Sequence, residues 1–167
     1  LADIEQKQPD WIFSTVVGDS DLYFRQQYIG QGFTPDTMPT ASLTTTEAEV
    51  KAMGVEFGEG HYSAMAYFQS LDNPANHRFV KDFLNSPHGG DGVTHASMEA
   101  TYLSFKFFKK AVEKVILESG VNALSPELVR NASANIELSE NESPQGRIKI
   151  DGNNFNAYNE CWWYAII

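Results

Sequence analysis

Small hydroxyl side chains gather at the ends of two apolar segments of the chain. The first segment, residues 11–17, runs into Gly18-Asp19-Ser20, and the second runs into Leu43-Thr44-Thr45-Thr46. Each segment is predicted to be a strand, and the residues after it are predicted to open a helix. In an open α/β sheet, ligands bind outside the carboxyl ends of the strands. The sequence therefore predicts a site for a small polar molecule at these two ends.

Thr44 is the first candidate contact, because its hydroxyl can donate and accept a hydrogen bond and it follows the predicted strand directly. Thr15, Thr45 and Asp19 come next, as groups that line the rim of the site or support its contacts. A purely structural role is the alternative, since helix N-caps favour threonine and aspartate. For Thr45 and Asp19 both roles stay open.

Catalysis would require a nucleophile, a base and an orienting group. Ser20 follows Gly18-Asp19, but Leu22 stands where a Gly-x-Ser-x-Gly elbow needs its second glycine. Cys161 has no evident histidine partner, and the four histidines show no metal-ligand spacing. We therefore expect no enzyme, no catalytic residue, no metal site and no cofactor.

Composition excludes several partners. With 167 residues, 42% of them hydrophobic, the chain is long enough for one packed domain. A net charge of −10 opposes binding to nucleic acid or to anionic membranes. No apolar run approaches the roughly 20 residues that span a bilayer, so membrane insertion is not expected. The single cysteine rules out an internal disulfide.

The predicted elements change character along the chain. Strands expected at 11–17, 38–43 and 61–68 alternate with helices, and the helices after residue 73 and over 97–119 follow with little strand between them. Residues 146–151 and 161–167 are predicted to form a terminal hairpin around Gly152-Asn153-Asn154. Such an order suits a chain that passes between two lobes, with crossings at the strand from His61 and near residues 135–145. The predicted parts are 1–60, 61–134 and 135–167.

Five collinear segments resemble the second half of type I periplasmic-binding-fold receptors: Trp11–Gly18, Ala41–Val50, Tyr67–Asn76, Met98–Tyr102 and Pro144–Ile148. The most similar members are the amide-sensing receptor that controls aliphatic amidase expression and the substrate-binding protein of urea ABC transporters. Residues 43–50 resemble the amide sensor more, and residues 67–76 resemble the urea binder more.

The resemblance implies an α/β fold of two Rossmann-like lobes joined by three crossings, with only the C-terminal part of the receptor in this chain. Residues 1–60 would be β/α units of the second lobe, residues 61–134 the crossing strand and helices of the first lobe, and residues 135–167 the return to the second lobe. The absent half supplies several ligand contacts in the family. We therefore expect either that missing half or self-association to cover the edges left open.

The resemblance also implies the ligand and the partners. A short amide or urea would bind in the cleft, with Thr44 in contact and Val17 lying against the ligand. Such a receptor would serve an ABC permease from the periplasm. A cytoplasmic amide sensor acting on a regulatory protein is the alternative. The chain begins at Leu1 without methionine, so a targeting segment that would separate the two is not in view.

Overall fold

The computed structural model describes the chain except for residues 88, 91, 160–162 and 167. It consists of two compact units. Unit 1 comprises Leu1–Phe68 together with the last strand, β7 (Trp163–Ile166), and unit 2 begins at Gln69 and contains the described residues as far as Asn159.

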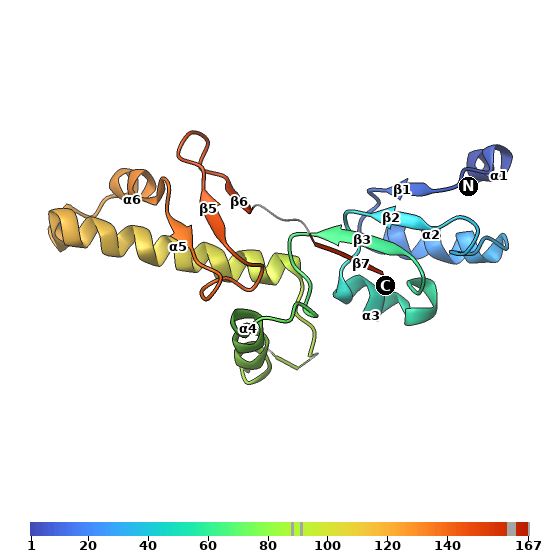
Figure 1. Cartoon of the computed structure of the whole chain (residues 1–167), viewed down its shortest axis with the longest axis horizontal. Helices are drawn as coiled ribbons and strands as arrows, with labels where there is room; N and C mark the ends of the chain where they lie inside the picture. The colour runs from blue at the N-terminus through green and yellow to red at the C-terminus, as the bar shows by residue number, and fades with distance from the viewer. Residues whose placement is uncertain (88, 91, 160–162, 167) are drawn as a thin grey trace. The chain divides into compact units, whose positions relative to one another are not determined.

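Unit 1 contains a four-stranded sheet in the order β1 (Ile12–Ser14), β2 (Thr40–Ser42), β3 (Tyr62–Met65) and β7 (Figure 1). β1, β2 and β3 run parallel, and β7 runs antiparallel to β3. The helices of this unit are α1 (Ala2–Lys7), α2 (Asp19–Gly30), α3 (Glu47–Met53) and the 3-10 turn η1 (Val55–Phe57).

The T-x-x-E sequence from Thr46 to Glu49 forms a capping box at the start of α3. The Thr46 hydroxyl accepts from the Ala48 N–H at 3.2 Å, and the Thr46 N–H donates to the Glu49 carboxylate at 2.8 Å. α2 begins differently: its N-cap is Gly18, at φ 60°, and no side chain caps it. Asp19 is the first residue inside the helix, where a carboxylate is stabilised by the helix dipole.

The two faces of the unit 1 sheet differ in burial. Ser14, Ser42 and Ser63 lie in register across β1, β2 and β3, and each is at most 4% exposed. The residues that alternate with these serines along each strand point to the other face, where Phe13 is 68% exposed. Residues 11–17 are expected from the sequence to form a strand buried on both faces, and this expectation is wrong. Among the described residues, β1 is an edge strand that pairs only with β2, and only one face of it is covered.

The buried face of α2 is polar rather than apolar. Asp21, Arg25 and Tyr28 face inward and are at most 1% exposed, whereas Tyr23 and Ile29 are exposed. The Tyr28 hydroxyl donates to the Met38 carbonyl at 2.8 Å. Apolar periodicity does not identify the buried face of α2, because the side chains of Asp21, Arg25 and Tyr28 make hydrogen bonds there.

Unit 2 contains one long helix, α5 (Ala96–Ser119), packed against shorter elements (Figure 1). Its three-stranded sheet is antiparallel in the order β4 (Glu137–Leu138), β5 (Ile148–Ile150) and β6 (Ala157–Asn159). The remaining helices are α4 (Pro74–Leu84), η2 (Val121–Ala123) and α6 (Pro126–Ser133).

The core of unit 2 lies on one stripe of α5. Leu103 and Phe107 pack with Leu138, Ile148 and Ile150, and further along the helix Ala111 and Val115 pack with Ala132 of α6. Four-residue spacing makes these residues a continuous face. Phe105 and Phe108 of the same helix are instead 71% and 59% exposed. α5 thus carries a second, uncovered apolar stripe.

The motif at residues 67–76 forms a polar junction at the start of unit 2. The Asn73 side chain caps α4 by accepting from the Asn76 N–H at 2.8 Å, and its amide donates to the Pro144 carbonyl at 2.8 Å. Asn76 is fully buried and donates to the carbonyls of Gln69 and Leu71. Gln69 accepts in turn from the Thr94 N–H at 2.6 Å.

Two expectations about the chain's return are wrong. β5 forms a hairpin with β6, while β7 pairs with β3 of unit 1, so the predicted terminal hairpin between 146–151 and 161–167 does not form. Residues 135–145 are not a crossing either: β4 lies in unit 2 with β5, and the chain changes unit between β6 and β7. Cys161 lies outside the described residues.

Candidate functional site

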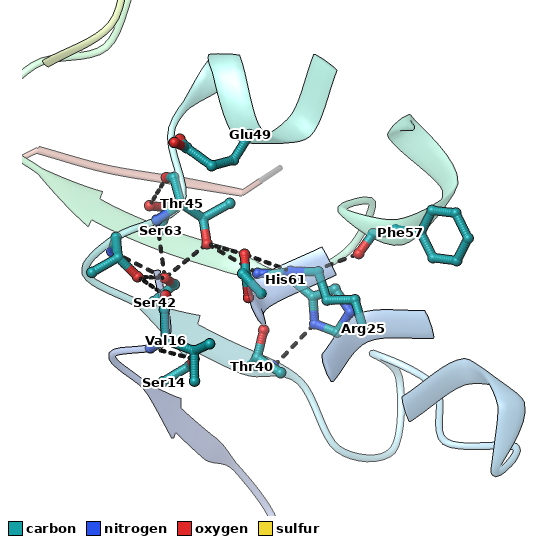
Figure 2. Close-up of polar contacts among 12 residues, drawn as sticks. Ser14, Val16, Arg25, Thr40, Ser42, Thr45, Glu49, Phe57, His61 and Ser63 are labelled. Carbon is teal, nitrogen blue, oxygen red and sulfur yellow. Dashed lines mark hydrogen bonds and ion pairs between the residues drawn. The ribbon is translucent and has the colours of Figure 1, made fainter. Parts of the chain in front are cut away.

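Two loops meet at the carboxyl ends of β1 and β2 (Figure 2). The Thr44 hydroxyl donates to the Val16 carbonyl at 2.5 Å, which ties the loop after β2 to the loop after β1. The Leu43 N–H donates to the Ser14 carbonyl at 3.3 Å and continues the parallel pairing into the loops. The structure thus brings Thr44 beside the segment that carries Val17.

The hydrogen bonds of Ser42 and Thr44 leave one acceptor free. Ser42 Oγ accepts from the N–H groups of Thr44 and Thr45, both at 3.1 Å, and lies 3.2 Å from Thr44 Oγ1. The Thr44 proton goes to Val16, and the single Ser42 proton has two acceptors in reach, Thr45 Oγ1 at 2.8 Å and Thr44 Oγ1 at 3.2 Å. Thr44 Oγ1 therefore keeps at least one lone pair for a donor from outside, and Thr44 is partly exposed.

Thr45 faces the opposite way and is 1% exposed. Its hydroxyl lies 3.0 Å from Asp21 Oδ2 and accepts from Arg25 Nη2 at 3.2 Å, and its carbonyl accepts from Ser63 Oγ at 2.6 Å (Figure 2). Since both lone pairs of Ser42 Oγ are occupied, the Thr45 proton goes to Asp21. Thr45 is accordingly a support of the loop and not a group that a ligand reaches from solvent.

The other candidate residues lie on the loop after β1. Val17 is 66% exposed, and Thr15 and Asp19 are exposed as well. Val17 is thereby available for an apolar contact next to Thr44. The hydrogen bonds described for this region do not draw Thr15 or Asp19 into the loop contacts, and their role at the rim stays a prediction.

Below the loops, α2 contributes a buried ion pair between Asp21 and Arg25, which was not predicted from the sequence. Arg25 Nε donates to Asp21 Oδ2 at 3.1 Å, and Arg25 Nη1 donates to the Phe57 carbonyl at 3.2 Å. The i,i+4 spacing of Asp21 and Arg25 was a visible signal, but such pairs are common on exposed helix faces. For Ser42 and Ser63 no signal beyond residue type exists, since register across strands brings them together.

His61 lies next to this ion pair and is 2% exposed. Its Nδ1 accepts from the Thr40 N–H at 3.0 Å, which requires an unprotonated Nδ1. Burial, with the Arg25 guanidinium adding to it, lowers the pKa of His61 from 6.5 to about 4, while the Asp21 carboxylate opposes the shift. His61 is therefore neutral at neutral pH and acts as a fixed acceptor.

In unit 2, Glu99 is a second buried titratable group, 1% exposed in the first turns of α5. Burial raises the pKa of Glu99 to about 8, although a backbone hydrogen bond from Gln145 and the charge of Lys106 oppose the shift. Unit 2 also has an apolar groove of about 770 Å³ between α5 and α6, whose lining includes Phe108, Val112 and Val129.

The described residues contain neither a candidate metal-binding cluster nor a candidate membrane-spanning helix. No three side chains of His, Cys, Asp or Glu come together there in a way that could hold a metal ion. Among the helices that the structure describes, none combines the length and the apolar character needed to cross a bilayer.

The chain belongs to the periplasmic binding protein domain family, whose model matches residues 1–162. Its α/β fold is the type I periplasmic-binding-protein fold, as expected from the sequence.

Solved structures with this fold cover nearly the whole chain. An amino acid ABC transporter substrate-binding protein from Pseudomonas fluorescens Pf-5 is similar over 99% of this chain and 41% of its own, with a TM-score of 0.76 and 16% identity. An ABC transporter solute-binding protein from R. palustris, in complex with benzoate, is similar over 98% and 41%, with a TM-score of 0.76 and 22% identity. The chain therefore spans about two fifths of the length of these solved relatives.

A curated relative named limonene hydroxylase, from Geobacillus stearothermophilus, is 30% identical over 118 residues. The match covers 66% of this chain and 21% of that protein. The chain thus spans about a fifth of this curated relative.

Proposed function

We propose that this chain provides part of a solute-binding protein that takes urea or a short neutral amide, and that its site lies at the carboxyl ends of β1 and β2. The observation that carries the proposal is the hydrogen-bond state of Thr44. Its hydroxyl proton is committed to the Val16 carbonyl, while at least one lone pair of the oxygen remains, and the residue is partly exposed. Amides and urea offer N–H donors to such an acceptor.

Charge and shape support a small neutral ligand. Thr44 and the neighbouring Val17 combine one polar acceptor with one exposed apolar side chain, which suits a planar amide with a short alkyl group. Asp21 and Arg25, below the loop, neutralise each other and are 1% exposed. A charged ligand would find no opposite charge of theirs to pair with.

The family match and the names of the solved relatives support a partner and a location for this role. In the proposed role the protein binds its solute in the periplasm and presents it to an ABC permease; the solved relatives are named as substrate-binding or solute-binding proteins of ABC transporters. A cytoplasmic amide sensor that acts on a regulatory protein remains the alternative. The part of the chain that resembles the limonene hydroxylase also lies within a binding-protein family, and we attribute no hydroxylation to it.

Calorimetric titration of the chain with urea and acetamide, beside leucine, tests the proposed ligand. Thr44→Val should weaken the affinity for the amide at least tenfold, because it removes the acceptor and leaves the Val16 carbonyl without its donor, a loss of about 1–3 kcal/mol. Thr37→Val is the matched control. Its hydroxyl also donates to a backbone carbonyl, that of Thr34, before β2 rather than after it.

Saturable binding of urea or acetamide that Thr37→Val leaves intact would support the site. Binding of leucine alone would overturn the proposed ligand class, and silence with all three would show that this chain by itself holds no working site.

The uncovered apolar surfaces predict that the isolated chain associates. Phe13 on the sheet and Phe105 and Phe108 on α5 are 59–71% exposed, and we propose that the missing half of the fold or a second copy covers them. Light scattering should therefore give a mass above the monomer's 18.6 kDa. Phe105→Ser with Phe108→Ser should lower it, whereas Leu117→Ser, outside that stripe, should not. A stable monomer at high concentration would contradict this prediction.

A further inference from the structure

The buried ion pair of α2 is poorly explained by stability alone. Asp21 and Arg25 are each 1% exposed, and their nearest nitrogen and oxygen lie 3.1 Å apart. Removing two charges from water costs several kcal/mol per ion, and apolar residues of similar volume often stabilise a protein as well or better. The atoms that the pair contacts indicate a role other than stability.

The Arg25 guanidinium joins three segments that are distant in sequence. Nε donates to Asp21 within α2, Nη2 donates to Thr45 in the loop after β2, and Nη1 donates to the Phe57 carbonyl at the end of η1 (Figure 2). Its planar fork can hold three acceptors in fixed directions, which the single ammonium of a lysine cannot reproduce.

The loop after β2 has its shape fixed through Thr45. The Thr45 hydroxyl accepts from Arg25 and donates to Asp21, its N–H donates to Ser42, and its carbonyl accepts from Ser63. Because Ser42 also accepts from the Thr44 N–H at 3.1 Å, the position of Thr44 depends on where Thr45 is held. The capping box at Thr46 orders the start of α3 but makes no contact with Arg25 among these bonds.

We propose that Arg25 is a positioning residue: through Thr45 and Ser42 it holds the loop after β2, residues 43–46, in the shape that presents the Thr44 hydroxyl outward. This inference deepens the proposed function and rests on it for the identity of the ligand. Asp21 keeps the guanidinium neutralised, so the anchor brings no net charge to a site for a neutral molecule. The backbone geometry of the loop can be tested with no ligand present.

Hydrogen exchange of the full chain, followed by mass spectrometry, tests the anchor directly. Arg25→Lys should speed exchange of the amides in residues 43–46 at least tenfold, while the amides of α5 stay unchanged. The same variant should weaken acetamide binding at least tenfold. Arg147→Lys is the matched control: Arg147 makes a two-pronged, exposed contact with Glu137 in unit 2, and the change should affect neither measurement.

The exchange result decides the inference separately from the ligand. Unchanged exchange at 43–46 in a folded Arg25→Lys variant would overturn it, even if binding is weaker. If the wild-type chain binds no amide, the proposed function fails and the exchange measurement still stands. Should Arg25→Lys fail to fold, the apolar pair Asp21→Leu with Arg25→Met removes both charges together, and wild-type exchange in that variant would overturn the anchor.

Discussion

Phe107→Ala should lower the free energy of unfolding of unit 2 by about 3–5 kcal/mol, the usual cost of truncating a buried phenylalanine. Phe107 is 6% exposed and packs with Leu103 of α5, Leu138 of β4, and Ile148 and Ile150 of β5. The truncation therefore leaves a cavity where the helix meets both strands. Guanidinium chloride unfolding, with the exchange of α5 amides as the local probe, measures the loss; urea is avoided as a denaturant because it is a proposed ligand.

Leu117→Ala is the matched control for this experiment. It truncates a large apolar side chain on the same helix, but Leu117 is 88% exposed and lies outside the stripe through Phe105 and Phe108. Its effect should stay within about 0.5 kcal/mol, as for most surface substitutions. Equal effects at the two positions would contradict the assignment of the core to the stripe through Phe107.

Lowering the pH from 7 to 4 should cost unit 1 up to about 3 kcal/mol of stability through His61 alone. Its pKa is about 4 in the folded protein against 6.5 for the free side chain, and each unit of difference corresponds to about 1.4 kcal/mol. Protons therefore bind the unfolded chain more readily, so the contribution is complete above pH 6.5 and is lost as the pH falls towards 4. Protonation would also oppose the hydrogen bond that Nδ1 accepts from Thr40.

His61→Asn isolates this contribution, because the Asn carbonyl oxygen can replace Nδ1 as the acceptor for the Thr40 N–H without titrating. The difference in unfolding free energy between pH 7 and pH 4, from guanidinium chloride curves, should be smaller in the variant than in the wild type. His77→Asn serves as the control, since the His77 side chain is 65% exposed beside Asp72. A wild-type slope in His61→Asn would refute the role of His61.

Local sequence signals identify the start of a helix where a cap or a proline occurs. The T-x-x-E box at Thr46, the Asn73-Pro74 start of α4 and the Ser125-Pro126 start of α6 all appear in the structure with side-chain caps. These signals work because each cap satisfies backbone groups within three residues of itself. The fold class, inferred from the resemblance, is confirmed by the family match; the proposed ligand contacts remain predictions.

Pairing and burial were decided by tertiary structure. β7 pairs with β3, about 100 residues earlier, rather than in a hairpin, because strand pairing depends on partners that local periodicity does not identify. α5 offers two apolar stripes, and only contact with β4, β5 and α6 determines which of them is buried. Asp21 and Arg25 occur at a spacing typical of exposed helices, yet they lie in the core.

The sequence by itself determined the caps, the parallel α/β segments and the hydroxyl-rich ends of β1 and β2, since each depends on neighbouring residues. Only the tertiary structure decided that Thr44 stays partly exposed while Thr45 is fixed inward by Arg25. The physical reason is that the direction of each hydroxyl follows from hydrogen-bond partners on α2, β3 and the loop after β1. Those partners are brought together by the register of the sheet and the packing of α2.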